Sequence, residues 1–177
     1  MSKEIVILSG SPRKAGNTDT LVAAFKEGAE SAGKTVTVFQ TAQMKISGCV
    51  GCEYCLENPG KCTLKDDMSE ILKALHKADV VVWASPVYYF SVTAQLKAAI
   101  DRSYPLINEN AKRSALLLTC ADESSDTAEG AIAIYRKTNQ YYGWDDAGTI
   151  IATGVEHRGD IAGHAALEEA LNLGREI

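Results

Sequence analysis

Short apolar runs rich in β-branched residues alternate with amphipathic segments along the chain, and this alternation limits the folds available to it more than any other feature. The runs predict strands at Ile5–Leu8, Val36–Phe39, Val80–Trp83, Ala115–Leu118 and Thr149–Ile151. The amphipathic segments predict helices at Thr18–Ala32, Asp67–Lys77, Val92–Tyr104, Thr127–Tyr142 and Gly163–Leu173. Strands that alternate with helices are typical of right-handed βαβ units, so we predict a parallel sheet covered by helices on both faces.

The apolar pattern within each strand indicates its place in the sheet. The runs that begin at Ile5, Val80 and Ala115 are apolar almost throughout, as expected for strands buried on both faces. The second run, TVTVFQ, alternates between polar and apolar residues and suits an edge. Five such strands fit the flavodoxin-like order 2-1-3-4-5, which is a three-layer αβα sandwich. We predict a single flavodoxin-like domain over residues 1–177, with a Cys-rich insertion at about 45–64.

Charge and hydropathy exclude several classes of partner. The 18 Lys and Arg residues against 23 Asp and Glu give a formal net charge of −5, which does not favour binding to nucleic acid or anionic membranes. No apolar run approaches the roughly 20 residues that a membrane span needs. The start, MSKEIVILSG, does not resemble a signal peptide. We expect a cytoplasmic protein.

The loop after the first predicted strand, SGSPRKAGNT, is suited to binding an anion. It leads into a helix, where backbone N–H groups and the helix dipole favour negative charge. The residues that we expect to hold a phosphate are Ser9, Ser11, Arg13, Asn17 and Thr18. Asn17 stands where a P-loop has its lysine, and the dinucleotide pattern GxGxxG is missing, so a terminal phosphate monoester such as that of FMN fits better. The alternative is an ordinary turn and helix cap.

A second loop, SPVYYF, follows the third predicted strand at the same edge of the sheet, where ligands of open α/β folds bind. A flat tricyclic ring needs apolar and aromatic walls. We expect the ring to be framed by Pro86, Val87, Tyr88 and Tyr89. The alternative is a core aromatic patch, and we expect Tyr89 or Phe90 to pack inside the protein or at a subunit contact.

Four of the five cysteines, Cys49, Cys52, Cys55 and Cys62, fall within fourteen residues in the spacing C-x2-C-x2-C-x6-C. Such clustering in a cytosolic chain favours metal binding or redox chemistry over structural disulfides. Four thiolates complete the ligand set of a [4Fe–4S] cluster. Zinc is a second reading, and free or reversibly paired thiols are a third. Cys120 follows an apolar run and is expected to be a small buried hydrophobic residue.

Together the two loops and the stretch CVGCEYCLENPGKCTLKDDM resemble the NAD(P)H-dependent FMN reductase group of flavodoxin-like proteins, especially its iron–sulfur flavoprotein branch. The resemblance is strong from residue 4 to about 104. It implies a homodimer or homotetramer with FMN near the subunit boundary and NAD(P)H as a substrate. The third FMN-contacting loop of the family would correspond to Thr119–Ser124, which here reads TCADES and is more acidic than the expected glycine-rich forms.

Our leading hypothesis is an FMN-dependent oxidoreductase, with NAD(P)H or a ferredoxin-type one-electron carrier as donor. A quinone, free flavin, metal species or protein would be the acceptor, and a [4Fe–4S] cluster would act as a relay. We name no catalytic side chain, because the flavin carries the difficult chemistry. The alternatives are a non-enzymatic flavodoxin-like electron carrier, which the modest charge disfavours, and a zinc-stabilised interaction module without flavin.

Overall fold

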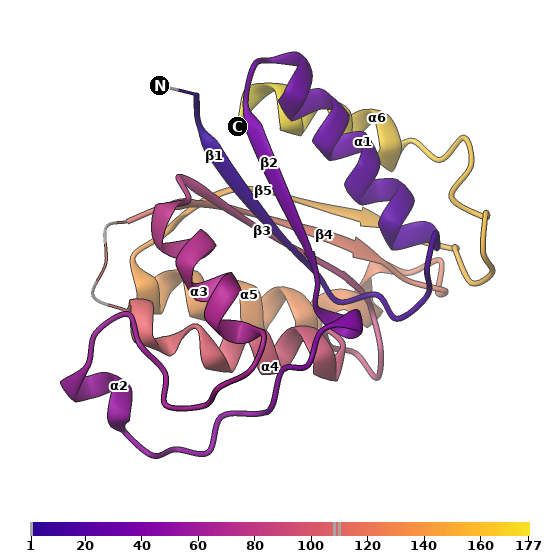
Figure 1. Ribbon diagram of the computed structural model, residues 1–177. Coiled ribbons are helices and arrows are strands. Elements are labelled where there is room, and N and C mark those ends of the chain that lie inside the picture. The colour runs from indigo at the N-terminus through magenta and orange to yellow at the C-terminus, as the bar shows by residue number, and fades with distance from the viewer. Residues whose placement is uncertain (1, 108, 110) are drawn as a thin grey trace.

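The computed structural model, which describes residues 2–107, 109 and 111–177, contains a five-stranded parallel sheet in the order β2-β1-β3-β4-β5 (Figure 1). The strands are β1 (Glu4–Ser9), β2 (Thr35–Gln40), β3 (Val80–Pro86), β4 (Arg113–Thr119) and β5 (Asp145–Ala152). All five predicted strands and their predicted order are therefore confirmed, each strand being longer than its apolar centre.

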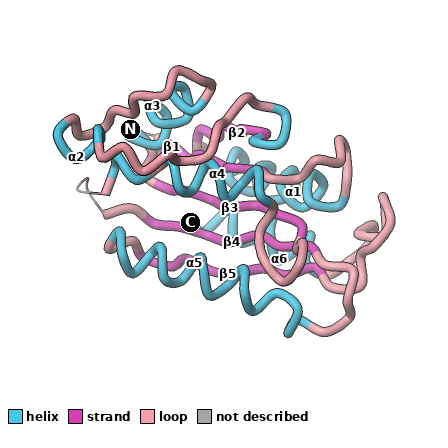
Figure 2. Tube along the Cα trace, turned by 90° about the horizontal axis from the view of Figure 1, so that it is seen from below, coloured by secondary structure: helices cyan, strands magenta, loops and turns pink. Residues whose placement is uncertain are grey.

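Helices cover both faces of this sheet. The longer helices are α1 (Asn17–Ser31), α3 (Met68–Lys77), α4 (Ala94–Arg102), α5 (Glu129–Tyr142) and α6 (Ala166–Glu176). Helices α1 and α6 lie on one face, and α3, α4 and α5 lie on the other (Figures 1 and 2). The predicted three-layer αβα sandwich is confirmed. Among residues 2–107, 109 and 111–177, no helix combines the length and apolar character that crossing a membrane requires.

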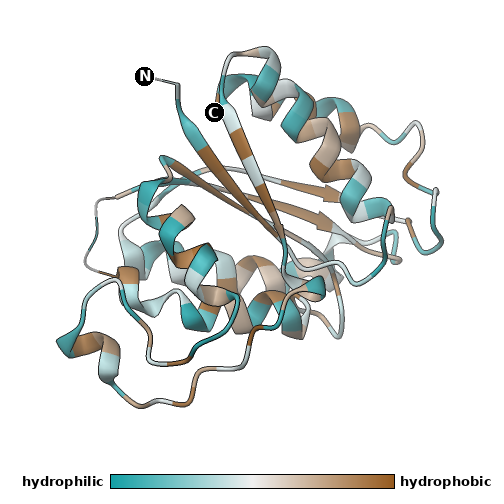
Figure 3. Cartoon of the chain, in the orientation of Figure 1, coloured by the Kyte–Doolittle hydropathy of each residue, from teal (hydrophilic) through white to brown (hydrophobic). Residues whose placement is uncertain are grey.

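The two faces of the sheet build two separate cores. Along β1, Ile5 and Ile7 pack toward α1 and α6, whereas Val6 and Leu8 pack toward α3, α4 and α5. This follows from the two-residue period of a strand, which sends successive side chains to opposite faces. The apolar colour of the central strands in Figure 3 reflects burial on both sides. The edge strand β2 keeps its alternating pattern, as predicted.

Two glycines let α1 and α6 approach closely. A Cβ atom on Gly28 would lie 1.9 Å from the carbonyl oxygen of Leu171, and one on Gly174 would lie 2.1 Å from that of Phe25. Neither position has room for a side chain, so the tight contact between these helices depends on both glycines.

Between β2 and α3 the chain forms a 3-10 helix, η1 (Thr41–Gln43), and then the Cys-rich insertion, which contains the short helix α2 (Tyr54–Glu57). The sequence predicted neither of these short helices. Two carboxylates close the base of the insertion. The Lys45 N–H donates to Asp67 Oδ2 at 2.7 Å, and the Ser47 N–H donates to Asp66 Oδ2 at 2.9 Å. The insertion is thereby attached to the start of α3, while α2 lies at the lower left of the molecule in Figure 1.

Candidate functional site

The loop after β1 is fixed against the start of α4 by Gly10. The Gly10 N–H donates to the Ala84 carbonyl at 2.8 Å, and Thr93 Oγ1 donates to the Gly10 carbonyl at 2.8 Å. A Cβ atom on Gly10 would lie 2.4 Å from Thr93 Oγ1 and 2.6 Å from Leu96 Cβ. Only glycine fits here, so the close approach of the loop to the first turn of α4 depends on Gly10.

Helix α1 begins without a side-chain cap, because its N-cap residue is Gly16. The first N–H groups of a helix have no partner within the helix, so those of α1 are available to an anion. Beneath the loop, Ser9 is fully buried in β1, and its Oγ has no hydrogen-bond partner among the described residues.

A cavity of about 220 Å³, here called the strand-end cavity, lies at the carboxyl ends of β1, β3 and β4. It is lined by Ser11, Arg13, Asn17, Thr18, Pro86, Val87, Tyr88, Thr119, Ala121, Val155 and Glu156. Seven of the nine residues predicted to bind FMN are in this set, so the structure brings the two predicted loops together. The other two are Ser9, which lies below the cavity, and Tyr89, which lines its neighbour.

That neighbour, the side cavity, has a volume of about 310 Å³ and is lined by Val87, Tyr89, Phe90, Cys120, Ala121, Asp122 and Thr127. Val87 and Ala121 line both cavities, so the two are contiguous. Cys120 is 4% exposed, which confirms the expectation of a buried residue. Part of the TCADES loop therefore forms a wall, in the place predicted for the third loop.

The amide of Asn17 holds the loop that follows β5. Its Nδ2 donates to the carbonyls of Val155 at 3.2 Å and His157 at 2.8 Å, and its Oδ1 accepts from the Gly159 N–H at 3.0 Å. Both amide hydrogens therefore donate within the protein, and this side chain positions a wall of the cavity. Only the backbone N–H of Asn17 is left to bind a phosphate. The wall formed by Val155 and Glu156 was not predicted, because no sequence motif marks that loop.

The other three predicted donors are Ser11, Arg13 and Thr18. Ser11 Oγ makes only long contacts, donating to the Arg13 carbonyl at 3.4 Å and accepting from the Arg13 N–H at 3.3 Å. Arg13 is exposed and uses Nη1 to donate to the Glu156 carbonyl at 2.8 Å. The hydroxyls of Thr18 and Thr119 lie 2.8 Å apart. A guanidinium has five N–H groups, so Arg13 can contact a phosphate while it keeps its contact with Glu156.

A tight turn projects two aromatic side chains outward beside these cavities. Tyr88 and Ser91 exchange backbone hydrogen bonds of 2.9 and 3.1 Å, and Tyr89 and Phe90 between them have φ values of +50° and +64°. Tyr89 is 99% exposed and Phe90 is 62% exposed. The prediction that one of them packs inside is therefore wrong for this chain, because a two-residue turn points both central side chains away from the core. The subunit contact remains a prediction.

All four clustered cysteines line one small cavity of about 40 Å³, here called the cysteine cavity, together with residues such as Arg102 and Tyr104. Cys49 and Cys52 are exposed, and Cys55 and Cys62 are half-buried. Burial raises the pKa of the Cys55 thiol, and the nearby Cys62, Cys49 and Cys52 sulfurs raise it further. Within the described part of the chain, no three His, Cys, Asp or Glu side chains are placed to hold a metal ion, so ligation by these thiols stays a prediction.

Arg102, the last residue of α4, is a functional candidate that the sequence analysis missed. It is 2% exposed, and its Nη1 and Nη2 donate to Asp66 Oδ2 and Oδ1 at 2.8 and 3.0 Å. This hydrogen bonding holds the pKa of Asp66 below its usual range. Burial acts to lower the pKa of Arg102, but Asp66 and the neighbouring Cys62 sulfur outweigh it and raise that pKa. No local pattern marks Arg102, because Asp66 and Cys62 are distant in sequence.

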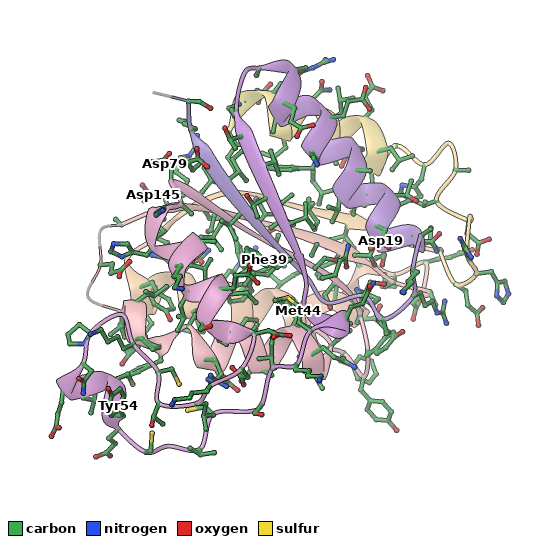
Figure 4. The ribbon with its side chains drawn as sticks, in the orientation of Figure 1. Asp19, Phe39, Met44, Tyr54, Asp79 and Asp145 are labelled. Atoms are coloured by element: carbon green, nitrogen blue, oxygen red, sulfur yellow. The ribbon has the colours of Figure 1, made fainter. Side chains whose placement is uncertain are left out.

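The strand-end cavity and the cysteine cavity lie at opposite ends of α4. The N-cap of α4, Thr93, contacts the loop after β1, and its last residue, Arg102, lines the cysteine cavity. Nine helical residues rise about 13 Å, which sets the scale of the separation. In Figure 4, Tyr54 on α2 and Asp19 at the start of α1 accordingly lie on opposite sides of the view.

Comparison with known proteins assigns a family to this arrangement. Residues 4–134 match the family model described as NADPH-dependent FMN reductase. An iron–sulfur flavoprotein of Methanocaldococcus jannaschii is 41% identical over 103 residues, covering 58% of this chain and 53% of the relative. One from Archaeoglobus fulgidus is 43% identical over 96 residues, covering 54% of this chain and 43% of the relative. The matched part thus spans about half the length of these curated relatives.

Solved structures establish the fold. An NAD(P)H:quinone oxidoreductase from Methanothermobacter marburgensis superposes with a TM-score of 0.76 at 20% identity, covering 99% of this chain and 97% of that chain. An FMN-dependent NADH-azoreductase of Bacillus anthracis, determined in complex with FMN, gives a TM-score of 0.74 at 15% identity and covers 99% of both chains.

Proposed function

Because the chain belongs to the NADPH-dependent FMN reductase family, we propose that it is an FMN-dependent oxidoreductase that takes electrons from NAD(P)H. The observation that carries this proposal is the strand-end cavity, which joins the two loops predicted to hold the phosphate and the ring. A quinone, a free flavin or another small molecule would be the acceptor.

The residues present fit FMN. The uncapped start of α1, the Ser11 hydroxyl and the free N–H groups of Arg13 would hold the phosphate. Pro86, Val87 and Tyr88 would frame the ring. Bound FMN would supply hydride and single-electron transfer, while the chain orients it and excludes water from one side. The side cavity is contiguous with this site, so we assign to it the approach of the nicotinamide and of the acceptor.

A visible spectrum and a cofactor titration test this proposal. The purified protein should be yellow and should bind FMN stoichiometrically, and a quinone should support its oxidation of NADPH or NADH. Arg13→Ala should weaken FMN binding by about ten- to a hundredfold, because a charge-assisted hydrogen bond contributes about 1.5 to 3 kcal/mol. Lys14→Ala removes an exposed neighbouring charge that does not line the cavity and is the matched control.

Two outcomes would contradict the proposal in different ways. Protein that stays colourless and does not bind added FMN would remove the flavin altogether. A flavin that is photoreducible but supports no NAD(P)H turnover would indicate the flavodoxin-like electron carrier instead.

We further propose that Cys49, Cys52, Cys55 and Cys62 hold a [4Fe–4S] cluster that relays single electrons. Support comes from the four thiols that line one cavity and from the name that the curated relatives carry. Anaerobically purified protein should then contain about four irons per chain. Background iron would remove the cluster, and stoichiometric zinc in the same metal analysis would favour the structural alternative.

We also propose a homodimer or homotetramer. Tyr89 and Phe90 stand out from the surface beside the side cavity, where a second subunit would cover them. Light scattering on the eluting protein tests this, and a monomer at micromolar concentration would contradict it.

A further inference from the structure

One buried donor beside the cysteine cavity has no acceptor. Arg102 donates from Nη1 to the Ser47 carbonyl at 2.8 Å and to Asp66, and from Nη2 to Asp66. Its Nε–H is buried and lacks a partner among residues 2–107, 109 and 111–177. A buried N–H left unpaired costs about 1 to 3 kcal/mol, so such groups in native proteins call for an explanation.

The position of Arg102 supplies that explanation. It lines the cysteine cavity with all four clustered thiols, and the Cys62 sulfur lies beside its guanidinium. The lining is mostly apolar, with residues such as Val50, Leu64 and Pro105, and it also includes Glu53 and Asp101. Low local polarity strengthens any charge interaction made there. Arg102 is therefore a buried cation with an unused donor on a residue that lines the same cavity as the four thiols.

We propose that Arg102 is a positioning residue for the iron–sulfur centre, which its buried guanidinium orients through Cys62 and whose reduction potential it raises. This inference rests on the cluster proposed above. Hydrogen bonds to cluster sulfurs and nearby charge set the potential of such centres. One-electron reduction makes a thiolate-bound centre more negative, and a fixed cation favours that reduced form.

The ion pair with Asp66 predicts the direction in which each variant should shift the reduction potential. Its carboxylate accepts from both terminal nitrogens of Arg102 and from the Ser47 and Met68 N–H groups. The pair carries no net charge as long as both members are ionised. Removal of Arg102 leaves a negative charge near the cavity, whereas removal of Asp66 leaves a positive one. The two changes should therefore shift the potential in opposite directions.

The experiment compares Arg102→Gln, Asp66→Asn and the double variant with the parent, all purified anaerobically. Iron per chain is measured first, and the midpoint potential then follows from a redox titration monitored by electron paramagnetic resonance. Arg102→Gln should shift the reduction equilibrium at least tenfold toward the oxidised form, which is about 59 mV for a one-electron couple. Asp66→Asn should shift it the other way, and the double variant should lie between the two.

Lys26→Gln is the matched control. It removes one positive charge from an exposed pair with Glu30 on α1, and neither residue lines the cysteine cavity. Solvent screens that pair, so the potential should not move.

The outcomes separate this inference from the cluster itself. Parent protein without iron would overturn both, while the flavin spectrum reports independently on the oxidoreductase. Normal iron content with unchanged potentials, or with both single variants shifted the same way, would overturn the role of Arg102 alone. If Arg102→Gln fails to fold by circular dichroism, Asp66→Asn decides: a shift toward the reduced form supports the inference, and no shift or the opposite shift overturns it.

Discussion

Replacing Gly10 by alanine tests the geometry on which the strand-end cavity depends. The added Cβ atom would lie 2.4 Å from Thr93 Oγ1 and 2.6 Å from Leu96 Cβ, about 1 Å inside ordinary van der Waals contact. Neither neighbour is the free end of a long side chain, because Thr93 caps α4 and Leu96 is fully buried. The loop after β1 or the first turn of α4 must therefore move.

The structure sets the size of the expected effect. Overpacking of a core contact costs about 1 to 3 kcal/mol. Thr93 Oγ1 also accepts from the Leu96 N–H and donates to the Gly10 carbonyl. Loss of the cap costs about 1 kcal/mol and loss of the second hydrogen bond about 1 kcal/mol. The sum is about 3 to 5 kcal/mol, which is a large fraction of the stability of a typical domain.

Equilibrium urea unfolding of the flavin-free protein measures this loss as a lower midpoint with an unchanged slope. FMN affinity should fall as well, since the displaced loop forms the cavity wall. Gly48→Ala is the control, because a Cβ atom there would meet nothing within 4 Å. Its effect should stay within about 0.5 kcal/mol. A loss below about 1 kcal/mol for Gly10→Ala would refute the close approach.

Three further predictions concern the frame around the sites. Gly28→Ala should lower the free energy of unfolding, measured in urea, by about 2 kcal/mol or more, because the added Cβ would lie 1.9 Å from the Leu171 carbonyl oxygen. An unchanged free energy would contradict the tight packing of α1 on α6. Burial raises the pKa of Tyr142 to about 12, so its contribution to stability should be complete below about pH 10 and lost as the pH rises through about 12. Tyr142→Phe should reduce the loss of stability at alkaline pH, and an unaltered pH profile of stability would contradict the raised pKa of Tyr142. Because Arg102 lowers the pKa of Asp66, the stability from this carboxylate should be present above about pH 4 and lost as the pH falls through its depressed value. Asp66→Asn should cost about 3 kcal/mol at neutral pH and weaken the acid dependence, which thermal unfolding from neutral to acid pH checks.

Most of the fold was predictable from local sequence patterns. The β-branched runs of β1 and β3 specify buried strands by composition alone, and the alternating run of β2 specifies an edge. Two helices begin later than predicted. The predicted helix from Val92 begins at Ala94, because Thr93 takes the extended conformation of an N-cap. The last predicted helix begins at Ala166 instead of Gly163, whose φ of +77° is incompatible with a helix.

The candidate sites were predictable where a motif directly follows a predicted strand. The two loops were found because each follows a strand directly, and parallel strands bring their carboxyl ends to one edge. The engagement of Asn17 by the loop after β5 and the pairing of Arg102 with Asp66 could not be found this way. Both join segments far apart in sequence, and the partner residues carry no motif.

The separation of the two cavities also determines how variants of this protein can be interpreted. The strand-end cavity is built from the ends of β1, β3 and β4 and the loop after β5, whereas the cysteine cavity is built from the insertion and the last turn of α4 with the residues that follow it. Helix α4 contacts the first through Thr93 and the second through Arg102. A change confined to the insertion leaves the anchoring of α4 by Thr93 intact, so it should alter iron content without altering FMN retention. A change at Gly10 moves the start of the shared helix and can reach both cavities. Variants in the insertion are therefore the cleaner test of whether the proposed cluster and the proposed FMN site depend on separate residues.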